Sequence, residues 1–155
     1  MHTDPTSTLE RLVVTLEHGR RGFAEGADKL REGGYDNLAD VFDVATRERA
    51  AFARQLRAFD PGLWTEADQR GSTAGALHRV WLALREALAG DSPRGTLAAA
   101  ASDEEHTMEH FASALEGNEL TSDVRAVVTR QALAIKTSHE SMLALHDKYG
   151  DTSRR

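Results

Sequence analysis

Residues 9–42 read LERLVVTLEHGRRGFAEGADKLREGGYDNLADVF, and they give the clearest indication of the fold. Leucine, valine, phenylalanine and alanine recur in it at steps of three and four residues, which is typical of an amphipathic α-helix. Gly33 and Gly34 interrupt the pattern, and glycine readily ends a helix. Because the same spacing resumes after them, the stretch predicts two long helices joined by a very short connection. Such helices pack as antiparallel neighbours.

The helical pattern continues along the rest of the chain. We expect long helices over about residues 8–31, 35–59, 93–115 and 122–149, and a shorter helix over about 72–88. A second short connection lies between the last two helices, whereas residues 62–92 separate the two hairpins. A bundle with one long crossover is the arrangement of ferritin-like folds. The sequence therefore predicts an all-α, ferritin-like antiparallel four-helix bundle whose crossover carries the extra short helix.

The composition is that of a single globular domain. The chain has 155 residues, of which 40% are hydrophobic and 28% are charged. Aromatic residues contribute only 6%, and alanine and leucine dominate the apolar set, which favours helices over sheets. We expect one domain over residues 1–155, with residues 1–7 and 150–155 frayed.

Charge and residue types exclude several classes of function. The formal net charge is −6 and no arginine-rich arm is present, so we expect no nucleic-acid partner. The absence of cysteine removes disulfides, thiol nucleophiles and thiolate metal sites. Residues 1–8 do not resemble a signal peptide, and no apolar run has the roughly 20 residues that cross a bilayer. We therefore expect a cytoplasmic protein without a membrane partner.

The apolar stripes are each interrupted near the middle of their helix by a charged or amide residue. On the second helix, for example, the stripe is expected to run through Val41, Ala45 and Phe52. In chain order the four interruptions are Arg20, Glu48, Glu104 and Gln131. Since the middles of antiparallel helices lie at one height, these residues predict a polar layer, with His139 within reach. Burying an isolated charge costs several kcal/mol, so the charged side chains of this layer must pair with one another or bind a metal ion.

Two interpretations of the layer remain open. In the first, Arg20, Glu48 and Glu104 form an ion network that fixes the helix register, with Gln131 and His139 hydrogen-bonded to it. In the second, Glu48, Glu104 and His139, with Glu17 one turn from Arg20, bind iron, manganese or zinc. Di-iron bundles use Glu-x-x-His motifs, which this sequence lacks, and a guanidinium repels cations. The first interpretation is therefore favoured.

Five segments carry a resemblance to a known family. They are LVVTLEHGRRGF (12–23), ERAAFARQL (48–56), GALHRVWLAL (75–84), DEE (103–105) and RQALAIKTSHE (130–140). The chain resembles a bacterial family of uncharacterised, ferritin-like four-helix-bundle proteins. The resemblance implies that fold and no established activity. Glu48, Glu104, Gln131 and His139 match the family pattern, whereas Arg20 departs from it.

Two functions follow as hypotheses. The first is a non-catalytic structural, stress-associated or protein-interaction module, because no catalytic constellation can be recognised in the sequence. The second is a metal-binding ferritin-like protein that uses the ligands named above. A third hypothesis is a homodimer through an apolar surface of the crossover helix that contains Val80, Trp81 and Leu82. Packing of that helix on its own bundle explains the same residues equally well.

Overall fold

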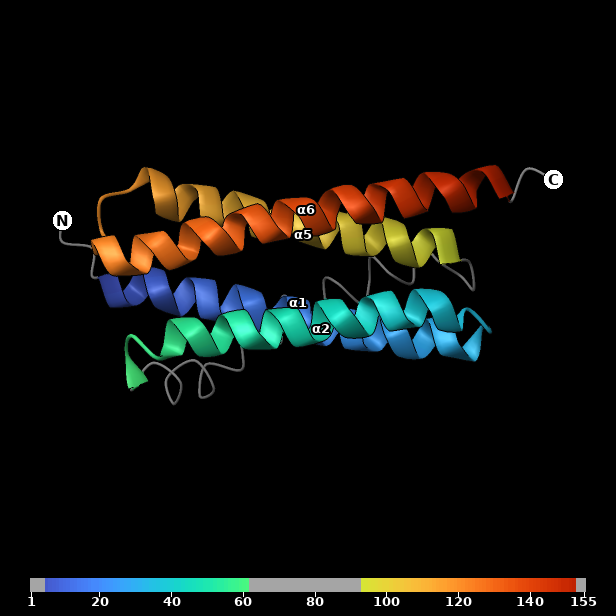
Figure 1. The fold of residues 1–155 in the computed structure, drawn as a ribbon, viewed down its shortest axis with the longest axis horizontal. Helices are drawn as coiled ribbons and strands as arrows, with labels where there is room; N and C mark the ends of the chain where they lie inside the picture. The colour runs from blue at the N-terminus through green and yellow to red at the C-terminus, as the bar shows by residue number, and fades with distance from the viewer. Residues whose placement is uncertain (1–4, 62–92, 153–155) are drawn as a thin grey trace.

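A computed structural model describes residues 5–61 and 93–152 of the chain (Figure 1). The described residues form helices and no strand, and the four long helices are those expected from the sequence. Their bounds are Pro5–Glu32 for α1, Asp36–Arg57 for α2, Pro93–Glu116 for α5 and Ser122–Thr152 for α6. The all-α, four-helix architecture predicted for these residues is thus confirmed. The short helix expected over 72–88 lies outside the described residues.

The turn between α1 and α2 shows why this hairpin is so tight. Gly34 has a φ of 86°, in the left-handed region that side chains with a Cβ rarely adopt. The amide of Tyr35 donates to the carbonyl oxygen of Leu30 at 2.8 Å, and the amide of Gly34 donates to that of Arg31 at 3.0 Å. These bonds satisfy carbonyl groups that the last helical turn leaves open. The helix therefore ends where the two glycines of the sequence predict it.

The four helices pack in two antiparallel hairpins, α1 with α2 and α5 with α6 (Figure 1). The α1 helix also contacts α5, and α2 contacts α6. Figure 1 shows that α1 and α6 run in one direction and that α2 and α5 run in the other. The end of α2 and the start of α5 consequently lie at opposite ends of the bundle.

The buried apolar residues divide into two clusters along the bundle. One cluster lies at the α1 N-terminal end and is anchored by Leu12, Leu16 and Phe111. The other lies toward the α1–α2 turn and is anchored by Phe23, Phe42 and Leu97. All six side chains are at most 2% exposed. Between the clusters the core is polar, and this middle layer is the region of interest.

Two details differ from the sequence-based expectations. The apolar stripe of α2 predicts that Val41 and Phe42 both face the core, but only Phe42 is fully buried, whereas Val41 is 37% exposed. The α1 helix also begins at Pro5 and α6 continues to Thr152, so both helices are longer than predicted. Proline is well tolerated in a first helical turn, which explains the earlier start. Within the described helices, none is both long enough and apolar enough to traverse a bilayer.

Candidate functional site: a buried ion layer at mid-bundle

An ion pair between Arg49 and Glu104 joins the two hairpins at the centre of the bundle. Nη2 of Arg49 on α2 lies 2.5 Å from Oε2 of Glu104 on α5. The exposed fraction of the side chain is 1% for Arg49 and 0% for Glu104. A buried charge of either sign is costly without a partner, so each of these residues requires the other.

The guanidinium of Arg49 has two further neighbours. Its Nη1 lies 3.1 Å from Oε1 of Glu48, whose side chain is 34% exposed at the edge of the layer. Its Cζ lies 5.5 Å from the centroid of the Phe23 ring, which is the geometry of a cation–π contact. Arg49 thus contacts α1 and α5 as well as its own helix, and it is the centre of the layer.

A second polar pair lies beside the first. Nε2 of His18 on α1 is 3.0 Å from Oδ1 of Asp103 on α5, and both side chains are at most 10% exposed. Gly19 places backbone next to both pairs, because a Cβ there would lie 3.5 Å from Oδ2 of Asp103 and 3.7 Å from the Arg49 side chain. The two pairs together link α1, α2 and α5 at one height.

Burial raises the pKa of Glu104 to about 7 from its ordinary value of 4.5. The positive charge of Arg49 and a hydrogen bond from Ser138 on α6 act against this rise. The negative charges of Asp103 and Glu48 add to it. The layer therefore contains three carboxyl groups, of which Glu48 and Glu104 contact the Arg49 guanidinium and Asp103 contacts His18. The carboxyl group of Glu104 takes up a proton near neutral pH.

The structure brings together only part of the set that the sequence singled out. Glu104 lies inside the layer and Glu48 at its edge, as described above. Arg20 instead donates to Glu17 on its own helix at 2.8 Å, and its side chain is 35% exposed. Glu17 also pairs with Arg57, which ties α1 to α2 outside the layer.

Gln131 and His139 on α6 are also placed apart from the pair. Nε2 of Gln131 donates to the carbonyl oxygen of Phe52 at 3.2 Å and to Oε1 of Gln55 at 2.9 Å, so Gln131 ties α6 to α2. Gln131 is 2% exposed. His139 is half-buried. The α6 residue that reaches Glu104 is Ser138, the immediate neighbour of His139.

Three residues of the layer were not expected from the sequence: His18, Arg49 and Asp103. A usable signal existed for Arg49. The buried positions of α2 include Phe42, Ala45, Ala53 and Leu56, and residue 49 continues their spacing of three and four. The signal was ambiguous because Val41 and Phe52 define a second stripe, rotated around the same helix, that points to Glu48 instead.

The donor groups of the layer bear on metal binding. Across residues 5–61 and 93–152, no three His, Asp or Glu side chains converge in a way that could hold a metal ion. His106 and His110 share a spacing that suits chelation, but Nδ1 of His110 lies 2.8 Å from Oγ1 of Thr15. His106 lies near Glu109 with both side chains largely exposed.

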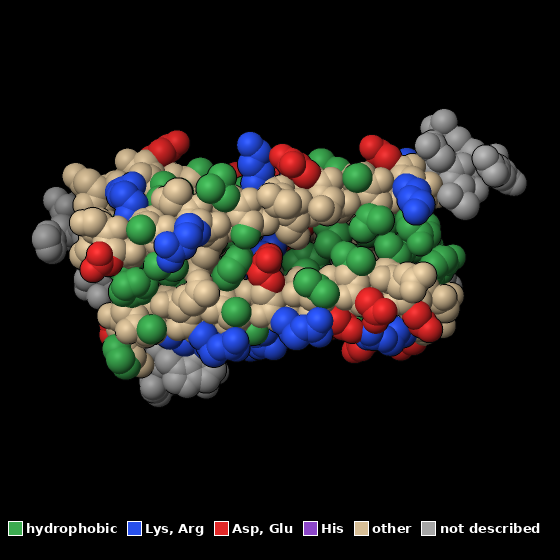
Figure 2. Space-filling view, viewed as in Figure 1, with side chains coloured by type: hydrophobic (Ala, Val, Ile, Leu, Met, Phe, Trp, Pro, Cys, Tyr) green, Lys and Arg blue, Asp and Glu red, His purple; other side chains and the backbone are tan. Residues whose placement is uncertain are grey.

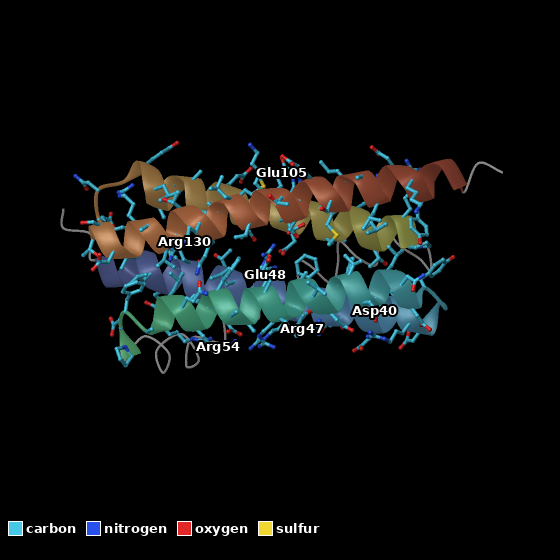
Figure 3. All side chains as sticks on the ribbon, viewed as in Figure 1. Asp40, Arg47, Glu48, Arg54, Glu105 and Arg130 are labelled. Carbon is cyan, nitrogen blue, oxygen red and sulfur yellow. The ribbon has the colours of Figure 1, made fainter. Side chains whose placement is uncertain are left out.

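The protonation of Glu104 makes a testable prediction. Between pH of about 4.5 and about 7 the folded chain keeps a proton on Glu104 that the unfolded chain has lost. The free energy of unfolding should therefore fall as pH rises through this window. Urea unfolding at several pH values measures the slope, and Glu104→Gln should flatten it. Glu105→Gln is the matched control, because Glu105 is exposed on the outside of α5 (Figure 3). An equal slope in wild type and Glu104→Gln contradicts the prediction.

A known protein family matches most of the chain. The family described as Domain of unknown function (DUF2383) matches residues 4–117, which include α1, α2 and α5. The matched residues contain both members of the Arg49–Glu104 pair and both members of the His18–Asp103 pair. No curated protein matches the chain.

Proposed function

The chain belongs to the family described as Domain of unknown function (DUF2383), and we propose that it is a ferritin-like, single-domain bundle with a non-catalytic role. Its role is that of a structural or protein-interaction module. The observation that carries the proposal is the position of Arg49: a guanidinium, bonded to Glu104, occupies the centre of the bundle.

The order of the helices supports the ferritin-like assignment. Because α2 and α5 run in the same direction, one connection has to pass from one end of the bundle to the other (Figure 1). The remaining connections, between α1 and α2 and between α5 and α6, are short hairpin turns. One long crossover between two hairpins is the connectivity of ferritin-like folds.

The chemistry of the layer supports a structural role. In di-iron bundles, carboxylates and histidines from all four helices face one another around two cations. Here the carboxyl groups of Glu48 and Glu104 already contact the Arg49 guanidinium, which is always positively charged. This positive charge would repel a metal ion that entered the layer. The directed bond of Arg49 to Glu104 joins the two hairpins at one register. A buried ion pair of this kind adds specificity to packing more readily than it adds stability.

A metal-binding role is the alternative, and one observation favours it. The layer offers the carboxyl groups of Glu48, Asp103 and Glu104, whose oxygen atoms are potential metal ligands. The ligands would be Glu48 and Glu104 with His139 and Glu17, and the metal would be iron, manganese or zinc. His139 and Glu17 would have to turn toward the layer, since Glu17 is now paired with Arg20 and Arg57.

Elemental analysis separates the two roles. We expect protein purified without an affinity tag to contain iron, manganese and zinc far below one ion per chain. A Glu48→Ala/Glu104→Ala variant provides the comparison, and we expect the same trace content in it. Stoichiometric metal that disappears in the double variant would overturn the structural proposal and establish the alternative. Stoichiometric metal that survives in the variant would place a metal site elsewhere.

A further inference from the structure

The side of α1 that points away from the core is buried. Val14 lies about 160° around the helix from Leu16, which is fully buried in the core. Val14 is nevertheless only 9% exposed, and Glu10, one turn before it, is 6% exposed. Apolar residues that point outward on other helices reach solvent instead, with exposed fractions of 56% for Val44 on α2 and 62% for Leu133 on α6. The outer side of α1 is therefore unlike the outer sides of α2 and α6.

The described helices that pack along α1 lie on its two flanks. On one flank Glu17 pairs with Arg57 of α2. On the other flank Oγ1 of Thr15 lies 2.8 Å from Nδ1 of His110 on α5. Val14 points outward between these flanks, because it lies opposite the core side of the same helix. The four described helices thus leave the burial of Val14 unexplained.

The connection between α2 and α5 has two possible routes. These two helices lie diagonally across the bundle, since α1 and α6 each contact both of them. Residues 62–92 therefore pass over α1 or over α6 on the way from one end of the bundle to the other (Figure 1). On α6 the outward positions 133, 136, 140 and 143 are all exposed. Figure 2 shows the face formed by α2 and α6, where charged and hydrophobic side chains of both helices reach the surface. The route over α1 is the one that agrees with the burial of the two helices.

The length and pattern of the connection suit a route along α1. The connection has to cover the length of α2, whose 22 residues extend about 33 Å. A helix over 72–88 would cover about 25 Å of this distance, and the residues on either side of it add the rest. Such a helix would carry one apolar stripe, formed by Leu77, Trp81, Leu84 and Leu88. It would therefore have one face to bury against a neighbouring helix.

We propose that residues 62–92 cross the bundle over α1, with the apolar stripe of 72–88 packed on the outer side of α1 around Val14. The expected helix would run parallel to α1, because the connection starts at the end of the bundle where α1 begins (Figure 1). His78 and Arg85 flank the stripe and would bring positive charge toward Glu10, whose burial requires a polar partner. The stripe around Trp81 then lies inside one chain and not between two copies. This inference is independent of the metal content of the bundle.

Tryptophan fluorescence tests the proposal with the full chain, because Trp64 and Trp81 are its two tryptophans and both lie in the connection. A Trp64→Phe variant leaves Trp81 as the single tryptophan. We expect Trp81 to emit at short wavelength and to be poorly quenched by acrylamide, as a tryptophan shielded from water does. Val14→Asp in this background should shift the emission to longer wavelength and raise the acrylamide quenching constant.

The matched control is Val44→Asp, which makes the same change at an exposed position on α2. It should leave the emission of Trp81 unchanged. Circular dichroism on each variant checks that the helices remain folded. The proposal is overturned if Trp81 in the Trp64→Phe variant emits like a tryptophan in water, or if Val14→Asp and Val44→Asp affect its emission equally.

A thiol-attached quencher distinguishes the connection of the same chain from a second copy, without changing Val14. The chain has no cysteine, so Arg21→Cys provides a single labelling site at an exposed position two turns after Val14 on the same side of α1. A nitroxide attached there should quench the emission of Trp81 at every protein concentration. The same label at Leu133→Cys on α6 should quench it much less. Equal quenching from the two sites, or quenching from position 21 that disappears on dilution, would overturn the proposal.

Discussion

Replacement of Arg49 by alanine is expected to lower the free energy of unfolding by about 3–5 kcal/mol. The change leaves Glu104 buried at 0% exposure without its cationic partner. In the wild type, the positive charge of Arg49 lowers the pKa of Glu104. This pKa should therefore rise further in the variant. Chemical denaturation at a pH well above the pKa of about 7 measures the loss, because at lower pH a proton on Glu104 replaces part of the missing positive charge. A change in the free energy of unfolding below about 1 kcal/mol would contradict the inference that buried Glu104 depends on Arg49.

Removal of both charges should have a much smaller effect. Arg49→Met/Glu104→Leu replaces the ion pair with apolar side chains of similar volume, and such exchanges are often neutral or stabilising by about 1–4 kcal/mol. A large loss of unfolding free energy in Arg49→Ala with little loss in the double variant indicates that the pair fixes the helix register. A large loss in both variants indicates that the pair itself stabilises the fold. Arg130→Ala is the control, because Arg130 is exposed on α6 and should change stability by less than about 0.5 kcal/mol.

The contact between Gly26 and Phe42 carries the other large effect. A Cβ at position 26 would lie 2.6 Å from Cε2 and 2.7 Å from Cδ2 of the Phe42 ring. The ring cannot move away easily, since it is fully buried and packs edge-on against Phe23 with a centroid distance of 5.3 Å. Gly26→Ala is therefore expected to cost about 1–3 kcal/mol through overpacking. This cost outweighs the gain of about 1 kcal/mol that alanine brings to a helix.

Two further variants test whether contact with Phe42 causes the loss of stability in Gly26→Ala. Gly19→Ala on the same helix should be tolerated, because a Cβ there meets its neighbours at ordinary contact distances of 3.5 and 3.7 Å. Phe42→Ala alone should cost about 3–5 kcal/mol by leaving a cavity. In the Phe42→Ala background the steric clash is gone, so Gly26→Ala should be neutral or stabilising. Equal effects of Gly26→Ala in both backgrounds would show that the Phe42 contact is not its cause.

Local features of the sequence were enough to predict the four long helices and their two short connections. The spacing of apolar residues and the glycines at 33 and 34 are local signals, and the structure ends α1 where these signals place its end. Glu104 was also predictable, since it interrupts the stripe between Ala101 and Phe111, which are both buried. Such features depend on residues within a few turns of one helix, so local physics is enough to find them.

Which charged side chains contact one another depends on how the four helices pack. On α2 the apolar residues define two stripes, one through Val41 and Glu48 and one through Phe42 and Arg49. A helix with two such stripes can rotate about its axis with little change in its own energy, and contact with α1 and α5 selects one rotation. That selection exposes Val41 and buries Arg49 against Glu104. The physical reason is that the low solvation of the core penalises an unpaired charge, and a partner from another helix is unknown until the helices are packed.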